Sequence, residues 1–170
     1  MKAKQDGVAL SIPFDMSKQQ KRKLEDDKDF QEYTIKCFEH GEGYRDVCMR
    51  CRSMMFGIHL PALMTNVAFA CELYLKSLLF FERKDCRNHH DLFKLYNMLS
   101  DDMKSSVRIL RTRKSDKRGF ELSLKENGEA FVVFRYMYEN VTMSSDPQFL
   151  SELMDRCREL CLDVIPERLD

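Results

Sequence analysis

The hydrophobic positions of this chain recur at helical spacing over most of its length. The clearest pattern runs from about Leu60 to Arg83, where apolar side chains cover nearly the whole circumference and Pro61 falls in the first turn. A helix that is apolar nearly all round belongs at the centre of a bundle. No segment alternates convincingly between apolar and polar residues, so the sequence predicts an all-α helical bundle.

Segments on both sides of this helix predict the outer helices. A highly charged segment with a thin apolar stripe extends from Ser17 to about His40, and Gly41-Glu42-Gly43 is expected to end it. Ser100 is expected to cap one later helix, and Ser145-Asp146-Pro147 is expected to open the last one. The remaining predicted helices cover residues 44–56, 90–99, 101–113, 120–140 with a bend near Asn127-Gly128, and 147–165, with polar loops at 84–89 and 114–119.

On this basis the chain divides into an N-terminal arm with a charged helix, residues 1–43, and a helical bundle, residues 44–170. Its 170 residues are enough to bury a core without disulfides or a metal. Lys and Arg together number 28, as do Asp and Glu, so the formal net charge is zero. This balance argues against a strongly basic nucleic-acid coat protein and leaves room for a local basic patch.

Cysteine usage and the apolar stretch bear on the cellular environment. The chain has seven cysteines, an odd number, and its N-terminus does not resemble a secretory signal, so we expect free thiols in a reducing cytoplasm. The most apolar stretch, from Leu63 to Phe81, carries Glu72 and Lys76 at its centre. A bilayer disfavours both charges strongly, so we expect a buried helix and no membrane contact.

Two segments carry a family resemblance. Residues 66–79 read NVAFACELYLKSLL, and His90-Asp91-Leu92 with Leu95 follows eleven residues later. Residues 130–139 read AFVVFRYMYE, an aromatic segment that contains an arginine. This sequence resembles the HEPN family of helical-bundle domains, in which an A-x-x-A-x-E-x-x-L-K-x-L-L helix precedes an H-D/S-L-x-x-L segment. The resemblance covers roughly residues 44–165, and the charged N-terminal helix has no counterpart in it.

The resemblance implies a helical domain, often dimeric, in proteins related to RNA or nucleotides, including stress and defence systems. Many HEPN members are metal-independent ribonucleases whose arginine and histidine are separated by four to six residues. Arg83 with His89 or His90 has that spacing; the histidine would act as acid and base around the 2′-hydroxyl nucleophile, and the arginine would stabilise phosphate charge. In those nucleases the pair lies at a later helix, so His90 is better explained as an anchor of the helix that follows it.

A polar network within the bundle is the second candidate site. Glu72 and Lys76 are spaced i,i+4, yet their helix is otherwise apolar, so a charge there needs a partner. Arg135, in another apolar and aromatic segment, is the expected partner, and a Glu72–Arg135 ion pair would join two helices. The functional version is a small pocket for a phosphate or a base, lined by Asn66, Glu72, Lys76, His90, Arg135 and Tyr136.

A basic cluster follows the helix that begins after Ser100. Six cations lie within eleven residues and are opposed only by Asp116: Arg108, Arg111, Arg113, Lys114, Lys117 and Arg118. Cations suit the C-terminal end of a helix, so a solvated helix end is the favoured interpretation. Contact with the phosphate backbone of a nucleic acid is the alternative, and the loop has no aromatic residue for base stacking.

A zinc site is a further candidate. Cys48-x-x-Cys51 and Cys86-x-x-His89 have the ligand spacing of such a site. Both Cys48 and Cys51 fall inside a predicted helix, without the glycine-bearing turn of a zinc knuckle, so core cysteines are the favoured interpretation. We therefore expect no metal and no cofactor.

Together these features favour a non-catalytic HEPN-like helical module that forms a homodimer and binds RNA or a nucleotide, a partner protein, or both. Two alternatives stay open. One is a metal-independent ribonuclease that uses Arg83 with His89 or His90, and the other is a purely structural dimerising bundle. RNA cleavage that survives chelation would identify the ribonuclease, whereas a stable dimer without RNA affinity would identify the structural bundle.

Overall fold

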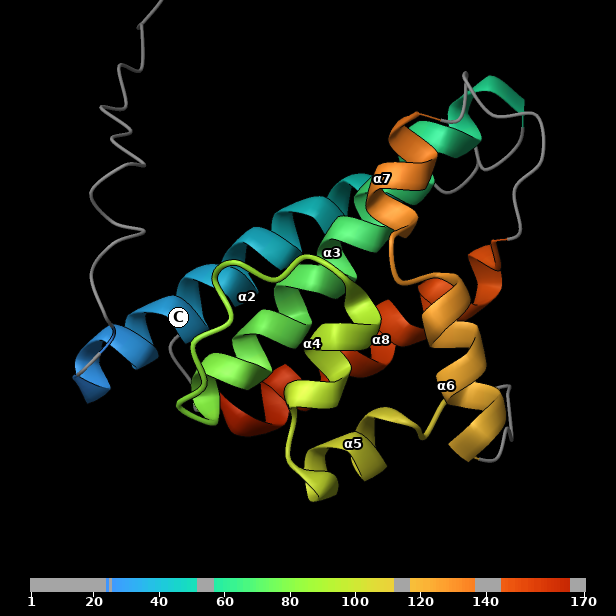
Figure 1. The fold of residues 1–170 in the computed structure, drawn as a ribbon. Coiled ribbons are helices and arrows are strands. Elements are labelled where there is room, and N and C mark those ends of the chain that lie inside the picture. The colour runs from blue at the N-terminus through green and yellow to red at the C-terminus, as the bar shows by residue number, and fades with distance from the viewer. Residues whose placement is uncertain (1–23, 25, 52–56, 112–116, 137–144, 166–170) are drawn as a thin grey trace, which may run out of the picture.

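The computed structural model describes residues 24, 26–51, 57–111, 117–136 and 145–165. Every regular element in this part of the chain is helical, and no strand occurs in it, so the all-α prediction is confirmed (Figure 1). In chain order the elements are α2 (Asp27–Arg50), the 3-10 turn η2 (Gly57–His59), α3 (Leu60–Phe81), α4 (Leu92–Met98), α5 (Asp101–Val107), α6 (Lys117–Glu126), α7 (Ala130–Arg135) and α8 (Pro147–Val164).

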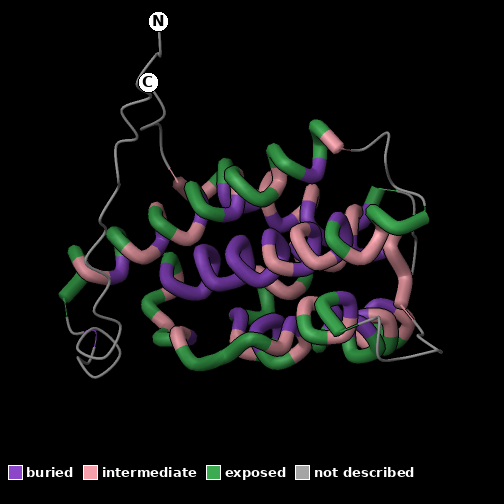
Figure 2. The backbone as a smooth tube through the Cα atoms, turned by 90° about the horizontal axis from the view of Figure 1, so that it is seen from above, coloured by how far each residue is buried: buried purple, intermediate pink, exposed green. Residues whose placement is uncertain are grey.

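Helix α3 forms the centre of the bundle and packs against α2, α4, α7 and α8. Every residue from Ala70 to Phe80 is buried, which confirms the prediction of a central helix that is apolar on nearly all sides (Figure 2). Judged by length and composition alone, Gly57–Phe81 could cross a membrane, with a mean hydropathy of 1.3. However, 78% of its most apolar stretch is buried inside the bundle, as in the core helix of a folded domain.

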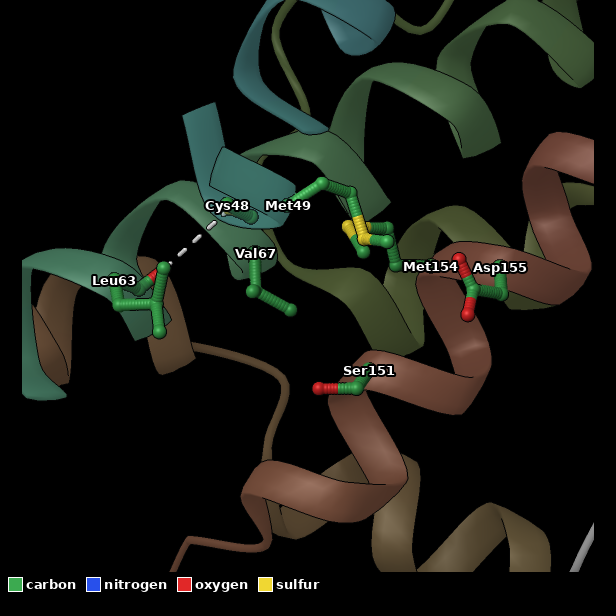
Figure 3. A pocket seen from close by; sticks show the side chains of 7 residues that line it. All are labelled: Cys48, Met49, Leu63, Val67, Ser151, Met154 and Asp155. Carbon is green, nitrogen blue, oxygen red and sulfur yellow. Dashed lines mark hydrogen bonds between the residues drawn. The ribbon is translucent and has the colours of Figure 1, made fainter. Parts of the chain in front are cut away.

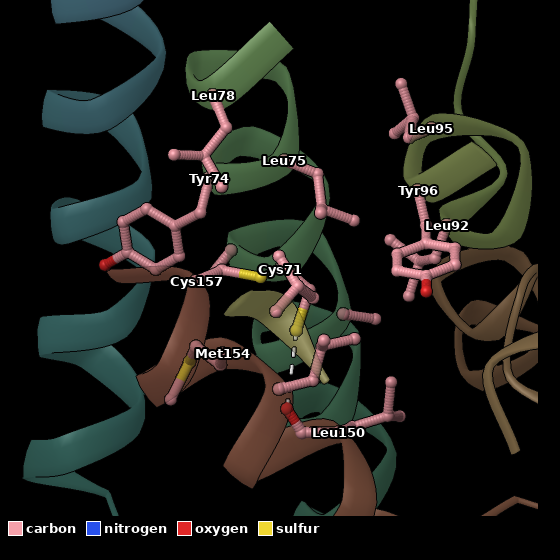
Figure 4. Close-up of a cluster of buried hydrophobic side chains, with 14 of the residues drawn as sticks. Cys71, Tyr74, Leu75, Leu78, Leu92, Leu95, Tyr96, Leu150, Met154 and Cys157 are labelled. Atoms are coloured by element: carbon pink, nitrogen blue, oxygen red, sulfur yellow. Dashed lines mark hydrogen bonds between the residues drawn. The ribbon is translucent and has the colours of Figure 1, made fainter. Parts of the chain in front are cut away.

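The core is densest where α3, α4 and α8 meet. Figure 4 shows side chains of these three helices in one cluster: Cys71, Leu75 and Leu78 of α3, Leu95 and Tyr96 of α4, and Leu150 and Cys157 of α8. Phe120 of α6 extends the cluster, since its ring centroid lies 5.4 Å from that of Tyr96 and 5.5 Å from that of Phe149. Rings at these separations attract each other beyond simple burial, so α6 is firmly attached to the core.

Helix α2 is longer than the sequence predicts. It continues from Asp27 to Arg50, so the break expected at Gly41-Glu42-Gly43 is wrong. The boundary expected between residues 43 and 44 therefore falls inside one helix. The remaining residues of the two predicted helices here, 17–23, 25 and 52–56, lie outside the described part of the chain.

The physical reason is that Gly41 serves helix packing. Gly41 faces α3, and a Cβ at this position would lie 2.8 Å from Cε1 of Tyr74. The glycine thus lets α2 and α3 approach closely without leaving helical geometry. The Tyr74 hydroxyl donates a hydrogen bond of 2.5 Å to Glu42, and Arg158 of α8 donates two more to the same carboxylate, at 2.7 and 2.8 Å. This network ties three helices together.

The predicted caps of the later helices are confirmed. The Ser100 hydroxyl accepts a hydrogen bond from the Met103 N–H, and the Asp146 carboxylate accepts one from the Phe149 N–H, with Pro147 in the first turn of α8. Helix α8 ends at Val164, as expected from the proline at position 166. Local side-chain chemistry therefore sets these helix ends.

Helix α5 ends at Val107, not near Arg113 as predicted. The Ile109 N–H bonds to the Ser106 carbonyl and the Leu110 N–H bonds to the Arg108 carbonyl, in place of the i→i−4 pattern. This turn buries the Leu110 side chain. Burial of one apolar side chain thus prevails over continuation of a polar helix, and residues 112–116 lie outside the described part of the chain.

The bend predicted near Asn127-Gly128 separates α6 from α7. Helix α6 already begins at Lys117, so residues 117–119 are helical and not part of a loop as predicted. The buried Asn127 side chain accepts hydrogen bonds from the Ser145 hydroxyl at 2.8 Å and from the Asp146 N–H at 3.0 Å. Asn127 therefore fixes the start of α8, and residues 137–144 are not among those described.

Helix α3 ends in a Schellman motif. The Lys84 N–H bonds to the Leu79 carbonyl, and the Arg83 N–H bonds to the Phe80 carbonyl. Arg83 has a φ of 62°, in the left-handed region that favours glycine. The arginine thus occupies a position where its own side chain carries a steric cost.

Candidate functional site

Glu72, Lys76 and His90 form a polar cluster at the edge of α3. Glu72 Oε1 forms an ion pair with the Lys76 ammonium and accepts a hydrogen bond from Nδ1 of His90, both at 2.9 Å. The side chains of Glu72 and Lys76 are only 2% and 9% exposed, whereas that of His90 is 66% exposed. The cluster therefore joins a buried ion pair to a histidine whose side chain is largely exposed.

The second oxygen of Glu72 contrasts with the first. Oε2 is buried and accepts no hydrogen bond from the described residues. A buried carboxylate oxygen without a donor costs free energy, so the ion pair with Lys76 must offset that cost. Loss of Lys76 would therefore leave the Glu72 carboxylate buried without its ion-pair partner, which destabilises the fold.

The His-Asp-Leu segment positions the histidine. His90 is held by Glu72, and Asp91 caps α4 by accepting a hydrogen bond of 2.7 Å from the Lys94 N–H. The Leu92 N–H bonds to the Gly128 carbonyl at 3.0 Å, and its side chain is buried. Each residue of the segment thus has a separate anchoring contact, which agrees with the structural interpretation of His90.

Arg83 and His90 do not meet. Arg83 forms an ion pair of 3.0 Å with Asp27 at the start of α2, whereas His90 bonds to Glu72. Glu72 lies eleven residues before Arg83, about 16 Å along a helix axis at the standard rise. His89 is exposed, and its backbone N–H bonds to the Cys86 carbonyl. The spacing of arginine and histidine in the sequence therefore does not translate into a shared site around Glu72.

The predicted Glu72–Arg135 ion pair is wrong. Arg135 is exposed at the end of α7, and its guanidinium lies 5.4 Å from the ring centroid of Tyr136. Asn66 donates to the Ala62 carbonyl one turn earlier in α3, so it does not join the network. The physical reason is proximity: His90, brought back by the loop after α3, and Lys76 occupy the one carboxylate oxygen that has donors.

The structure does not bring the four candidate zinc ligands together. The Cys48 thiol lies 3.8 Å from the Leu63 carbonyl, and the Cys86 thiol lies 3.9 Å from the Lys76 carbonyl. These carbonyls are thirteen residues apart on α3, about 20 Å along the helix. No group of three or more metal-ligating side chains is found in the described residues.

The thiols behave as core side chains. All seven cysteines are free, and five are buried, with Cys37 and Cys51 half-buried. Burial raises the pKa of Cys37 and of Cys48 to about 11, so both thiols stay protonated at neutral pH. This agrees with the favoured interpretation of the cysteines as core residues.

A small cavity lies between α2, α3 and α8 (Figure 3). It has a volume of about 70 Å³ and is lined by Cys48, Met49, Leu63, Val67, Ser151, Met154 and Asp155. Ligand pockets usually measure about 300–1,000 Å³, so this space is suited to a few water molecules and not to a nucleotide.

The basic cluster is partly neutralised by carboxylates. Arg111 and Arg156 both pair with Glu159, and Lys117 lies 3.8 Å from Glu121. Burial alone would raise the pKa of Glu159, but its hydrogen bonds to the two arginines outweigh burial and lower it. Arg111 and Lys117 therefore have less free charge than the sequence suggests.

Arg108 and Arg118 differ from the other cations of this cluster. The Arg108 guanidinium donates to the hydroxyls of Tyr96 and Ser105, each at 3.0 Å. Both acceptors are neutral, and no described carboxylate pairs with Arg108 or with the exposed Arg118. Since Tyr96 contacts Phe120, three residues into α6 after Lys117, the start of α6 lies close to Arg108. Arg113 and Lys114 lie outside the described residues.

The sequence did not reveal Tyr96 as a partner of Arg108. Tyr96 is fully buried in α4, where the helical pattern indicates only a core residue. The available signal is its hydroxyl, because a buried tyrosine hydroxyl needs a hydrogen-bond partner.

Comparisons with known proteins found no match to the chain among protein-family models, curated proteins or solved structures. The resemblance to HEPN domains therefore rests on the motif residues themselves.

Proposed function

We propose that this chain is a non-catalytic, HEPN-like helical module that binds the phosphate groups of RNA or of a nucleotide. The binding surface consists of Arg108, Arg111, Lys117 and Arg118, around α5 and the start of α6. Arg113 and Lys114 of the same cluster are expected to add to it. The observation that carries the proposal is the state of Arg108, whose guanidinium is fixed by neutral hydroxyls.

A guanidinium held in this way favours anion binding for two reasons. Its charge is not cancelled by a described carboxylate, and part of its side-chain entropy has already been lost on folding. Its remaining N–H groups are suited to phosphate oxygens. Arg111 and Lys117, which have carboxylate partners, are expected to contribute less than Arg108 and Arg118.

Fluorescence anisotropy with a labelled single-stranded RNA, over a series of salt concentrations, tests the proposal. The Arg108→Gln and Arg118→Gln variants are compared with Arg50→Gln, an exposed arginine of α2 that pairs with Asp46. We expect each of the first two to weaken binding and to reduce the slope of log K against log salt by about one. Absence of salt-dependent binding, or equal weakening by Arg50→Gln, would overturn the proposal.

One observation favours the ribonuclease alternative. His90 Nδ1 is hydrogen-bonded to a buried carboxylate and the side chain is 66% exposed, so Nε2 is left for proton transfer, as a general acid or base requires. Cleavage of a structured RNA in excess chelator, abolished by His90→Ala or His89→Ala in folded protein, would support it. The anchoring of Arg83 on Asp27 instead favours binding without cleavage.

We also propose that the chain associates with a second copy of itself or with a partner protein. Three aromatic rings form a row across α2, α3 and α7. The ring centroid of Phe69 lies 4.6 Å from that of Tyr44 and 5.0 Å from that of Phe131. Exposed apolar side chains border this row on α2 and α7, at Val47 and Val132. Such a surface supports association, and sedimentation equilibrium of the purified protein measures it.

A further inference from the structure

We infer that Tyr96 is a positioning residue for anion binding, because its hydroxyl holds Arg108 in the orientation that receives a phosphate. This inference rests on the proposed function and adds to it a residue that does not itself contact the ligand. Tyr96 is fully buried in α4, whereas Arg108 is half-buried in the turn after α5. The contact therefore links the core to the basic surface.

The geometry gives Tyr96 this role. Its ring lies in the core beside Phe120, at a centroid separation of 5.4 Å, so the hydroxyl has a fixed place. Nη1 of Arg108 donates to that hydroxyl and Nη2 donates to the Ser105 hydroxyl, so the planar guanidinium is held at two points. A side chain fixed in this way loses less entropy on binding than one free to rotate.

The same geometry assigns the ligand class. Both fixed contacts are hydrogen bonds from the guanidinium to uncharged oxygens, so the positive charge stays available. A tetrahedral anion such as a phosphate monoester or diester accepts from several donors at once and suits this cation. The edge of a nucleobase is uncharged, so it would not form an ion pair with the guanidinium.

The Tyr96→Phe variant tests this role, since it removes the hydroxyl and keeps the ring. We expect its RNA affinity to fall roughly three- to tenfold, the size of one lost hydrogen bond. A double-mutant cycle with Arg108→Gln is the decisive measurement, because Tyr96→Phe is expected to have no further effect once Arg108 is replaced. Ser105→Ala, at the second contact, is expected to show a smaller effect of the same kind.

The outcomes separate this inference from the proposed function. If the native protein binds no RNA, the proposed function fails. If Arg108→Gln weakens binding but Tyr96→Phe does not, the function stands and the role of Tyr96 is overturned. If Tyr96→Phe weakens binding equally with and without Arg108, its effect comes from the general fold, which also overturns the role. Circular dichroism and urea unfolding of each variant confirm that the protein is folded.

Discussion

Gly41 shows how one missing side chain sets the distance between two helices. Its Cβ position lies 2.8 Å from the Tyr74 ring, whereas the Cβ position of Gly43 has no atom within 4 Å. The two glycines share a helix and differ in surroundings. They therefore form a matched pair for measuring what close packing contributes.

We predict that Gly41→Ala destabilises the protein and that Gly43→Ala does not. Overpacking against Tyr74 is expected to cost about 1–3 kcal/mol, more than the gain of about 1 kcal/mol in helix propensity. Gly43→Ala is expected to show that gain alone. Urea unfolding followed by circular dichroism measures both, and equal gains in the two variants would contradict the packing argument.

The ion pair of Glu72 and Lys76 yields a second prediction. Glu72→Gln leaves the Lys76 ammonium buried without a carboxylate, so we expect a loss of about 3–5 kcal/mol of unfolding free energy. The double variant Glu72→Gln/Lys76→Met is expected to lose less than the sum of the single variants. Glu32→Gln, in the exposed i,i+4 ion pair of Glu32 with Lys36 on α2, is the control and is expected to cost less than about 1 kcal/mol.

Among the helices, local chemistry was predictable and long-range contacts were not. The centre of α3, the Ser100 and Asp146 caps and the bend at Asn127-Gly128 depend on neighbouring residues, so the sequence pattern was sufficient. The continuity of α2 depends on Tyr74, more than thirty residues away. Without the contact to Tyr74, the sequence pattern at Gly41 indicates only a helix end.

The candidate site shows the same division. The pairing of Glu72 with Lys76 follows from i,i+4 spacing, and it was predicted. The choice between Arg135 and His90 as the further partner depends on how a loop returns to α3 and on where α7 lies. Nothing in the residue types alone distinguishes these two donors.

The cap of α4 leads to a third prediction. Asp91 accepts a hydrogen bond from the Lys94 N–H, so Asp91→Ala is expected to cost about 1 kcal/mol, and Asp91→Asn to cost less. Hydrogen exchange of the amides in α4 is the measurement. Equal protection of these amides in the alanine variant and the native protein would show that the cap does not hold the helix.

For the protein as a whole, carboxylates that join helices set its behaviour in acid. Burial alone would raise the pKa of Glu42, but the hydrogen bonds from Arg158 and Tyr74 outweigh burial, so its pKa lies below the ordinary value of 4.5. The pKa values of Glu82 and Glu159 are also lowered, because their hydrogen bonds outweigh the opposing effect of burial. A lowered pKa means that the ionised group stabilises the fold above about pH 4.5 and that this contribution is lost as the pH falls.

We therefore predict that unfolding free energy falls steadily below about pH 4.5 and that Glu42→Gln weakens this dependence. The variant is also expected to be less stable at neutral pH, since Arg158 loses its partner. Glu39→Gln, an exposed position in the same helix, is the control. Identical pH profiles for Glu42→Gln and the native protein would contradict the role of the network.

The left-handed backbone of Arg83 has a practical consequence for separating activity from folding. Glycine adopts this φ of 62° without the steric cost that arginine carries, so Arg83→Gly is expected to raise the unfolding free energy by up to about 1 kcal/mol. Most single substitutions lower the unfolding free energy of the protein that carries them. Here the same change would remove the guanidinium and strengthen the fold, so under the ribonuclease alternative a loss of RNA cleavage would report on the missing guanidinium and not on unfolding.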